Sequence, residues 1–269
     1  MRTLLIAVLF GLLLVPGARA DAPNTDAASL SAPTSLADMV GESLKYDISF
    51  LWFHHLAEAK LSLTPAGRPH IYKAVLEART RGVAAWLTRD RVQRYVSRMK
   101  LGPDGKFHSL VHESHIIKGT GKNRVDRFKK YVFDADHHQV REKLVQNGKI
   151  RKEKVFSMGK GEPNDLLTAF YNFRAGFFGK IVPGGHYVIP SFSHKGESDI
   201  IVDILPRDQW PHRDFFPSGG MLGKVTADKE EFGTGDGSIY VWFNKFDQPD
   251  MGVVEDVIGL GNVRGRLRY

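Results

Sequence analysis

Histidines are the side chains of this sequence that first suggest chemistry. Seven of them cluster in the first half of the chain: His54, His55, His108, His112, His115, His137 and His138. On a strand, His108 and His112 would share one face, and His115 would face away. Zinc needs three or four converging ligands, and this spacing matches none of the short zinc motifs. We therefore interpret the histidines as surface residues and expect no metal site and no cofactor.

Serine and carboxylate side chains give no stronger catalytic pattern. Ser218 and Ser238 lie beside glycines, but neither lies in the Gly-x-Ser-x-Gly pattern of a nucleophile elbow, so we interpret both as turn residues. Residues 259–265 resemble a phosphate loop but lack its last glycine and a following helix. A glycosidase needs two carboxylates at a fixed separation, for which the unranked candidates are Asp165, Asp199, Asp203 and Asp247. We assign no catalytic residue, and whether the protein is an enzyme stays open, leaning against catalysis.

Aromatic side chains form the more suggestive pattern. They crowd one predicted helix, its exit and a proline-flanked loop: Phe170, Tyr171, Phe173, Phe177, Phe178, Trp210, Phe215 and Phe216. Core packing explains such a cluster. The alternative is that part of it lines a groove for an acyl chain, since binding sites are mostly apolar with few polar groups. The candidate ligand-binding residues are then Phe170, Phe173, Arg174, Phe177 and Trp210, where Arg174 holds a headgroup or neutralises the helix dipole.

A basic segment precedes these aromatic residues. Residues 118–130 carry six basic side chains and one acid, and the glycines at 119 and 121 favour a hairpin tip. Two interpretations stay open, a solvated face or contact with anionic lipid or envelope polymer. The candidate anion-contacting residues are Lys122, Arg124, Arg127, Lys129 and Lys130.

The N-terminus indicates export. A positive start at Arg2 precedes an apolar run over residues 4–15, and Ala18-Arg19-Ala20 is typical of a signal-peptidase site. The apolar run is shorter than the roughly 20 residues that span a bilayer. We expect a signal peptide at 1–20, cleavage after Ala20, and a soluble periplasmic protein with no transmembrane segment.

Composition narrows the function further. The chain has no cysteine, which excludes disulfides, thiolate metal sites and a lipid-modified N-terminal cysteine. The formal net charge of +8 favours anionic partners. Because the export signal argues against nucleic acid, we expect lipid or an anionic envelope polymer.

Period-two alternation dominates the rest of the chain and predicts strands. Leu44, Tyr46 and Ile48 alternate with polar residues, and similar segments follow at 57–63, 70–78, 91–101, 106–117, 124–133, 139–145, 149–156, 185–193, 198–205, 222–230, 238–244 and 251–269. Residues 21–42 have no apolar period and predict a flexible leader. Residues 43–269 predict a single, mostly β domain with a strongly curled, partial-barrel-like antiparallel sheet.

Two helices interrupt the predicted strands. A short one is expected at 82–88. The second begins at Asn164 or Asp165, with Asn164 as its cap, and its apolar residues follow helical spacing. We expect Phe170 and Phe173 to face the sheet and Asn172 to face water.

Several of these segments together resemble the DUF3108 family of uncharacterised exported bacterial proteins. The resemblance covers 43–269 and is carried by Tyr46–Trp52, Ala57–Ala59, Asp165–Arg174, Ile239–Asn244, Val257–Gly259 and Gly265–Leu267. It implies an exported, β-rich fold and no catalytic residues. The acidic turn at 246–250 is longer than the family's pattern. The predicted architecture is also similar to periplasmic lipoprotein-sorting proteins, which hold acyl chains in a concave sheet face, a likeness of fold alone.

The sequence therefore favours a non-catalytic periplasmic envelope protein that binds or carries an apolar or anionic component such as lipid. Two alternatives stay open: an envelope hydrolase acting on glycan or lipid, and a structural or assembly partner of an envelope complex. Carboxylates or a Ser-His pair in a cleft would favour the hydrolase, and an exposed strand edge would favour the assembly partner.

Overall fold

The computed structural model describes residues 35–50, 53–82, 85, 90–159, 161–227, 238–245, 248–257 and 261–268. The predicted signal peptide, residues 21–34 of the predicted leader and most of the short helix predicted at 82–88 lie outside these ranges.

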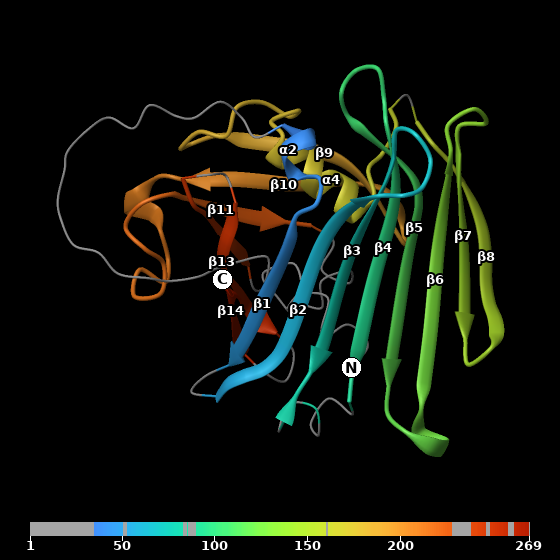
Figure 1. Ribbon diagram of the computed structural model, residues 1–269, viewed down its shortest axis with the longest axis horizontal. Coiled ribbons are helices and arrows are strands. Elements are labelled where there is room, and N and C mark those ends of the chain that lie inside the picture. Colours follow the sequence, from blue (N-terminus) through green and yellow to red (C-terminus); the bar gives the residue numbers. More distant parts are fainter. Residues whose placement is uncertain are drawn as a thin grey trace.

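The described residues form one antiparallel sheet of fourteen strands (Figure 1). The strands are β1 (Ser43–Phe50), β2 (Phe53–Pro65), β3 (Ile71–Thr80), β4 (Val92–Leu101), β5 (Phe107–Lys118), β6 (Val125–Asp134), β7 (Gln139–Gln146), β8 (Lys149–Ser157), β9 (His186–Ser193), β10 (Gly196–Leu205), β11 (Met221–Thr226), β12 (Ile239–Phe243), β13 (Pro249–Val257) and β14 (Gly261–Arg268). Short helical segments are α2 (Leu36–Met39), η1 (Gly121–Asn123) and η2 (Arg207–Gln209), and the main helix is α4 (Leu166–Arg174).

Two runs of consecutive strands meet in the middle of the sheet. Strands β1 to β8 and β9 to β14 each pair in chain order, and β1 pairs with β14, which leaves β8 and β9 at the two edges. The sheet curls so that its halves face each other but does not close (Figure 1). The chain from β8 to β9 contains α4, which lies between the two halves of the sheet and contacts β9 on one side and β4 and β5 on the other. The predicted curled antiparallel sheet with one packed helix is confirmed.

The sequence pattern also predicted which side chains of the first strands turn inward. Leu44, Tyr46 and Ile48 of β1 are buried, and the neighbouring strand buries Ala57, Ala59, Leu61 and Leu63. Registers such as Tyr46 opposite Ala59 place a large residue against a small one inside the curl. This alternation supplies part of the hydrophobic core to which the buried side chains of α4 also belong.

Two boundaries differ from the sequence-based expectation. Order begins before Ser43, because Ser35 and Asp38 form a reciprocal capping box around α2 and Leu36 and Met39 are buried in the core. The stretch 251–269 is not one continuous strand but forms the hairpin β13–β14.

A second, smaller apolar cluster lies at the seam. Phe192 of β9 packs edge-on against Tyr131, Phe133 and Phe156 of strands β6 to β8. The edge strands β8 and β9 are not paired through their backbones in the described residues. These aromatic side chains join the two edges instead.

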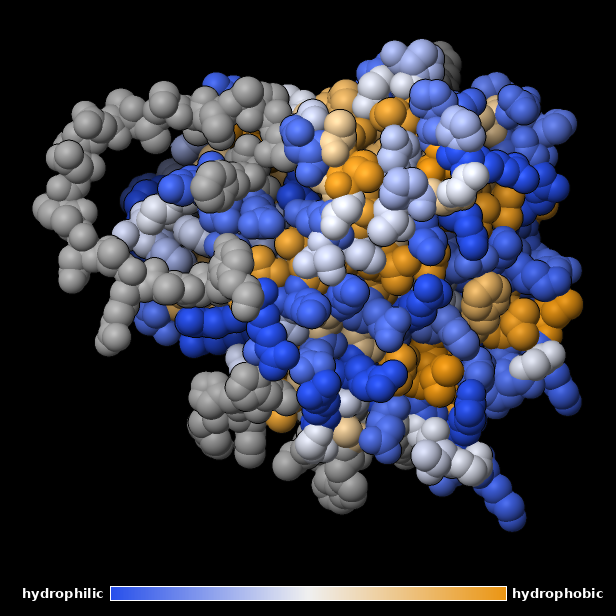
Figure 2. All heavy atoms as spheres, viewed as in Figure 1, coloured by the Kyte–Doolittle hydropathy of each residue, from blue (hydrophilic) through white to orange (hydrophobic). Residues whose placement is uncertain are grey.

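The outer surface is largely hydrophilic on the face shown in Figure 2. Of the large hydrophobic side chains in the described part of the chain, Ile150, Val155 and Val188 are exposed, and all three lie on the edge strands β8 and β9. No helix in the described ranges has both the length and the apolar character needed to cross a bilayer.

Candidate functional site

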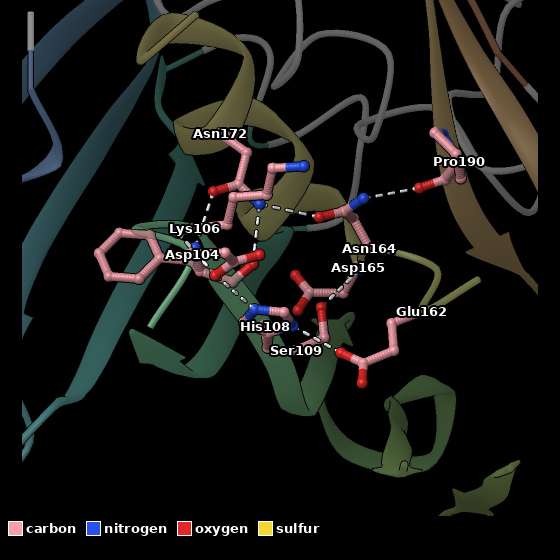
Figure 3. Close-up of polar contacts among 10 residues, drawn as sticks. Asp104, Lys106, His108, Ser109, Glu162, Asn164, Asp165, Asn172 and Pro190 are labelled. Carbon is pink, nitrogen blue, oxygen red and sulfur yellow. Dashed lines mark hydrogen bonds and ion pairs between the residues drawn. The ribbon is translucent and has the colours of Figure 1, made fainter. Parts of the chain in front are cut away.

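The N-terminus of α4 is fixed by Asp165. Its carboxylate accepts hydrogen bonds from the backbone N–H groups of Leu167 and Thr168 and from the Thr168 hydroxyl. The predicted cap at Asn164 is therefore wrong by one residue. Asn164 instead donates from its side chain to the Pro190 carbonyl, and its backbone pairs with β9 (Figure 3).

Asn172 faces the protein interior, which contradicts the expectation that it faces water. It is 1% exposed. Its side chain accepts from the Phe107 N–H at 2.9 Å and donates to the Phe107 carbonyl at 2.8 Å and to Asn164 at 3.0 Å (Figure 3). An amide can satisfy both backbone groups of one residue, so Asn172 joins α4 to the start of β5.

A buried polar cluster joins the start of α4 to β4 and β5. Ser97 donates to Asp165 at 2.5 Å, and the His112 ring nitrogen Nδ1 lies 2.9 Å from the Ser97 hydroxyl and 3.3 Å from Asp165. The Ser109 hydroxyl accepts from the Asp165 N–H. The His112 ring stacks between Tyr95 and Tyr131.

A β-bulge creates this cluster. The register between β4 and β5 shifts at Arg98 and Met99, so one residue of β5 is left over between Ser109 and Val111. The extra residue reverses the alternation, which turns both Ser109 and His112 inward. His108 therefore does not share a face with His112, and that expectation is wrong.

The cluster contains serine, histidine and aspartate but lacks the geometry of a catalytic triad. In a triad, the two ring nitrogens of histidine separate the serine from the acid, whereas here Nδ1 faces both Ser97 and Asp165. Burial alone would raise the pKa of Asp165, but hydrogen bonds from His112, Ser97 and Thr168 lower it to about 2. The arrangement therefore stabilises a permanently charged helix cap.

His108 lies outside this cluster, on the rim. Its two ring nitrogens contact Glu162 at 2.5 Å and Asp104 at 3.0 Å (Figure 3). Partial burial opposes protonation, but the two carboxylates outweigh it and raise the pKa of His108. The contacts connect the β4–β5 hairpin to the loop before α4. Because the carboxylates lie on opposite sides of the ring, they do not converge on a metal position.

Only two of the five predicted ligand-binding residues line a common crevice. Phe170 and Phe173 of α4 face strands β9 to β12 across a narrow space of about 30 Å³, enough for roughly one water molecule. Its walls are entirely apolar: Ala169, Phe170, Phe173, Ile189, Ile200, Val202, Val225, Val241 and Phe243. Phe177 lies beyond the helix under the Lys106 ammonium, and Trp210 is buried and donates to the Leu205 carbonyl.

Arg174 is held by an ion pair within the protein. It is 3% exposed and donates to both oxygens of Glu42, at 2.7 and 2.9 Å. Its guanidinium also lies 5.3 Å from the centre of the Phe170 ring. Arg174 therefore joins the last turn of α4 to the segment that enters β1, and the geometry favours its structural role over contact with a headgroup.

A second crevice, with a mixed polar and apolar lining, adjoins the apolar one, and Ile200 forms part of both walls. Its polar lining comes from β4 to β6 (Tyr95, His112, Ser114 and Lys129) and from the opposite sheet half (Ser191, Ser193 and Ser198), and its apolar lining includes Leu166, Phe192 and Ala227. Polar groups on the concave face therefore begin beside the wholly apolar crevice.

The predicted basic residues do not form one surface, because β6 distributes them over both faces. Arg127 and Lys129 point to the concave side. Lys130 points outward to Glu113, at 3.2 Å, and Arg124 is paired with Asp126. Lys122 is exposed in η1.

The sequence analysis did not identify Gln93 and Ser97 on the concave face of β4, or Arg91, which directly precedes this strand and points the same way. All three are buried. The only signal is the alternation of Gln93, Tyr95 and Ser97 with Arg94 and Arg98. Since polar residues occur on both faces, that pattern did not reveal which face turns inward.

No protein-family model matches the chain, and no curated protein matches it. Among solved structures, the chain is similar to the crystal structure of a beta-barrel-like protein of the domain of unknown function DUF1849 from Brucella abortus. The TM-score is 0.45 and the sequence identity 11%, over 84% of this chain and 95% of that chain. A likeness this distant assigns no family, so membership of the DUF3108 family stays a prediction.

Proposed function

We propose that this protein is a non-catalytic binding or carrier protein for an amphipathic envelope component such as a lipid. One observation carries the proposal, namely the wholly apolar crevice under α4 that adjoins, at Ile200, a crevice with both polar and apolar side chains. A ligand with an apolar and a polar part matches such a surface. Export to the periplasm, proposed from the N-terminal sequence, would give the protein access to lipids of the envelope.

The crevice is narrow, so an acyl chain enters only when side chains or α4 move. The helix has nine residues, and displacing it would widen the crevice that it forms with strands β9 to β12. The hydrolase alternative has less support, since Ser97, His112 and Asp165 are buried and do not have triad geometry.

Native mass spectrometry of protein purified from its own envelope tests the proposal, with co-purified lipid as the expected result. Two variants then change the crevice in opposite directions. Ala169→Leu fills it and should reduce the bound lipid, whereas Val225→Ala enlarges it and should retain or increase the lipid. Unfolding of both variants is measured in parallel. Lipid-free wild-type protein, or equal lipid in both folded variants, would contradict a binding role for this crevice.

An assembly role is the second candidate, favoured by the β8 edge. In the described chain β8 has a strand neighbour on one side only, and it exposes Ile150 and Val155. Its basic residues, Lys149, Arg151, Lys152 and Lys154, disfavour pairing between copies. A photo-crosslinker at Val155, compared with one at Lys60 in the middle of the sheet, should capture a defined partner in cells if this edge is an interface.

A further inference from the structure

A basic pocket lies on the concave face beyond the crevice of mixed lining. It has a volume of about 590 Å³ and is lined by Arg91, Ile116, Lys118, Val125, Arg127, Leu144, Gln146 and Arg151. Four of these residues are cationic, and none of the described lining residues is acidic. Three are aliphatic, so the pocket combines positive charge with apolar walls.

The strand registers explain why three of the four cations converge. Gln93, Ile116, Arg127 and Gln146 lie opposite one another across β4 to β7, and Lys118 lies opposite Val125 in the next row. Arg91 directly precedes β4 and shares the inward direction of Gln93 and Tyr95. The curl of the sheet then turns these side chains toward a common space.

Arg91 is the unusual member of this pocket. It is 3% exposed, and its Nε and Nη2 atoms are buried without a hydrogen-bond partner. No ion pair joins Arg91 to any described carboxylate. Burial lowers the pKa of Arg91 to about 10; the charge of Arg127 acts in the same direction, and Tyr95 acts in the opposite one. It therefore stays protonated at neutral pH. A buried charge without a partner is costly, and an anion bound in the pocket would supply that partner.

We propose that the pocket around Arg91 binds the phosphate group of an anionic, partly apolar ligand. Guanidinium groups bind phosphate oxygens in a bidentate manner, and four cations match a group with more than one negative charge better than a single carboxylate. The aliphatic side chains Ile116, Val125 and Leu144 would contact the part of the ligand beside the phosphate. This inference deepens the proposed function by naming the anionic part of the ligand, but phosphate binding is measurable without lipid.

Inorganic pyrophosphate is the first probe, with calorimetry and thermal unfolding as readouts. Wild-type protein should bind it and unfold at a higher temperature in its presence. Arg91→Met should weaken binding about tenfold or more. Because it removes an unpartnered buried charge, the same change should leave the ligand-free unfolding temperature equal or higher. A fall in that temperature with unchanged pyrophosphate binding would overturn the proposal.

A matched pair on β6 separates the pocket from general surface charge. Arg127→Gln and Lys130→Gln remove one charge each from the same strand, but only Arg127 faces the pocket. We expect Arg127→Gln to weaken pyrophosphate binding several-fold and Lys130→Gln to leave it unchanged. Equal losses in both variants, or no binding by the wild type, would overturn the proposal.

Vesicles distinguish the two sources of the phosphate group. Wild-type protein is mixed with phosphatidylcholine vesicles containing or lacking phosphatidic acid. Binding that requires phosphatidic acid and is lost in Arg91→Met assigns the site to a lipid headgroup. Pyrophosphate binding without vesicle binding would support the pocket and assign it to a soluble phosphate compound. If the protein purified from its own envelope also carries no lipid, this result would contradict the proposed lipid carrier but not the phosphate pocket.

Discussion

Ser97 donates its hydroxyl hydrogen bond to Asp165, 68 positions later in the chain, with 2.5 Å between the two oxygens. Because Asp165 also caps α4, this bond attaches the helix to the inner face of β4. His112 approaches the same carboxylate oxygen from β5. The cluster therefore positions the helix that lies between the two halves of the sheet.

Replacing Asp165 with Asn should destabilise the fold. Asn keeps an acceptor for the helix N–H groups but loses the charge that Ser97, His112 and Thr168 stabilise. At neutral pH the loss in unfolding free energy should be on the order of 2 kcal/mol, from the lowering of the pKa from 3.8 to about 2. Because the pKa of Asp165 is lower in the folded than in the unfolded protein, its charge stabilises the fold fully at pH values above the unfolded pKa. This stabilisation is lost as the pH falls through the folded pKa. Urea unfolding at pH 7 and pH 2.5 should thus show a smaller difference between the two proteins in acid; an equal difference would contradict the charged cap.

His108 should make stability depend on pH in the opposite direction. Its pKa is raised from 6.5, with desolvation opposing and Asp104 and Glu162 favouring the charged form. The stability that protonated His108 contributes to the fold is therefore fully present below the pKa of the unfolded histidine. It is lost as the pH rises through the raised pKa of His108 in the folded protein. The pKa of Asp104 is lowered by the same contact, so the contribution should be greatest between about pH 4 and pH 6.5.

Thermal unfolding of His108→Gln beside wild type tests this dependence. The variant should be less stable at pH 5.5 and closer to wild type at pH 8.5. Glu162→Gln removes one of the two carboxylates that contact His108. It should therefore reduce, but not abolish, the change in stability between pH 5.5 and pH 8.5. A deficit of His108→Gln that is the same at both pH values would show that the ring acts only through neutral contacts.

The sequence predicts the sheet well because alternation is a local property. The inward residues of β1 and β2, the turns between strands and the existence of α4 all follow from neighbouring residues. Arg91 and Arg127 reach one pocket because of the strand registers and the curl of the sheet. Neither can be predicted from neighbouring residues in the sequence. The bulge after Ser109 puts His108 and His112 on opposite faces of β5, and nothing in the sequence around it distinguishes it from a regular strand.

Asn172 illustrates a different limit. A polar residue on an amphipathic helix is normally expected to face water, yet this one pairs with both backbone groups of Phe107. Asn172→Leu would leave the Phe107 N–H and C=O buried and unpaired, which should cost about 2–4 kcal/mol of unfolding free energy. Asn123→Leu, at an exposed residue of η1, is the control and should change stability by about 0.5 kcal/mol or less. Chemical denaturation showing equally small effects for both would place Asn172 at the surface.

Arg174 and Glu42 should behave as a coupled structural pair. Arg174→Met retains an unbranched side chain against Phe170 but leaves the mostly buried Glu42 carboxylate without its guanidinium, which should cost about 3–5 kcal/mol. Adding Glu42→Gln removes the stranded charge, so the double variant should recover most of that loss. A double-mutant cycle by urea unfolding measures the coupling, and bound lipid is quantified for each folded variant. If Arg174 held a headgroup instead, the double variant would unfold like the wild type and still lose its ligand, because the charge needed for binding would be gone. If the ion pair only fastens α4 to the segment before β1, stability and ligand should return together.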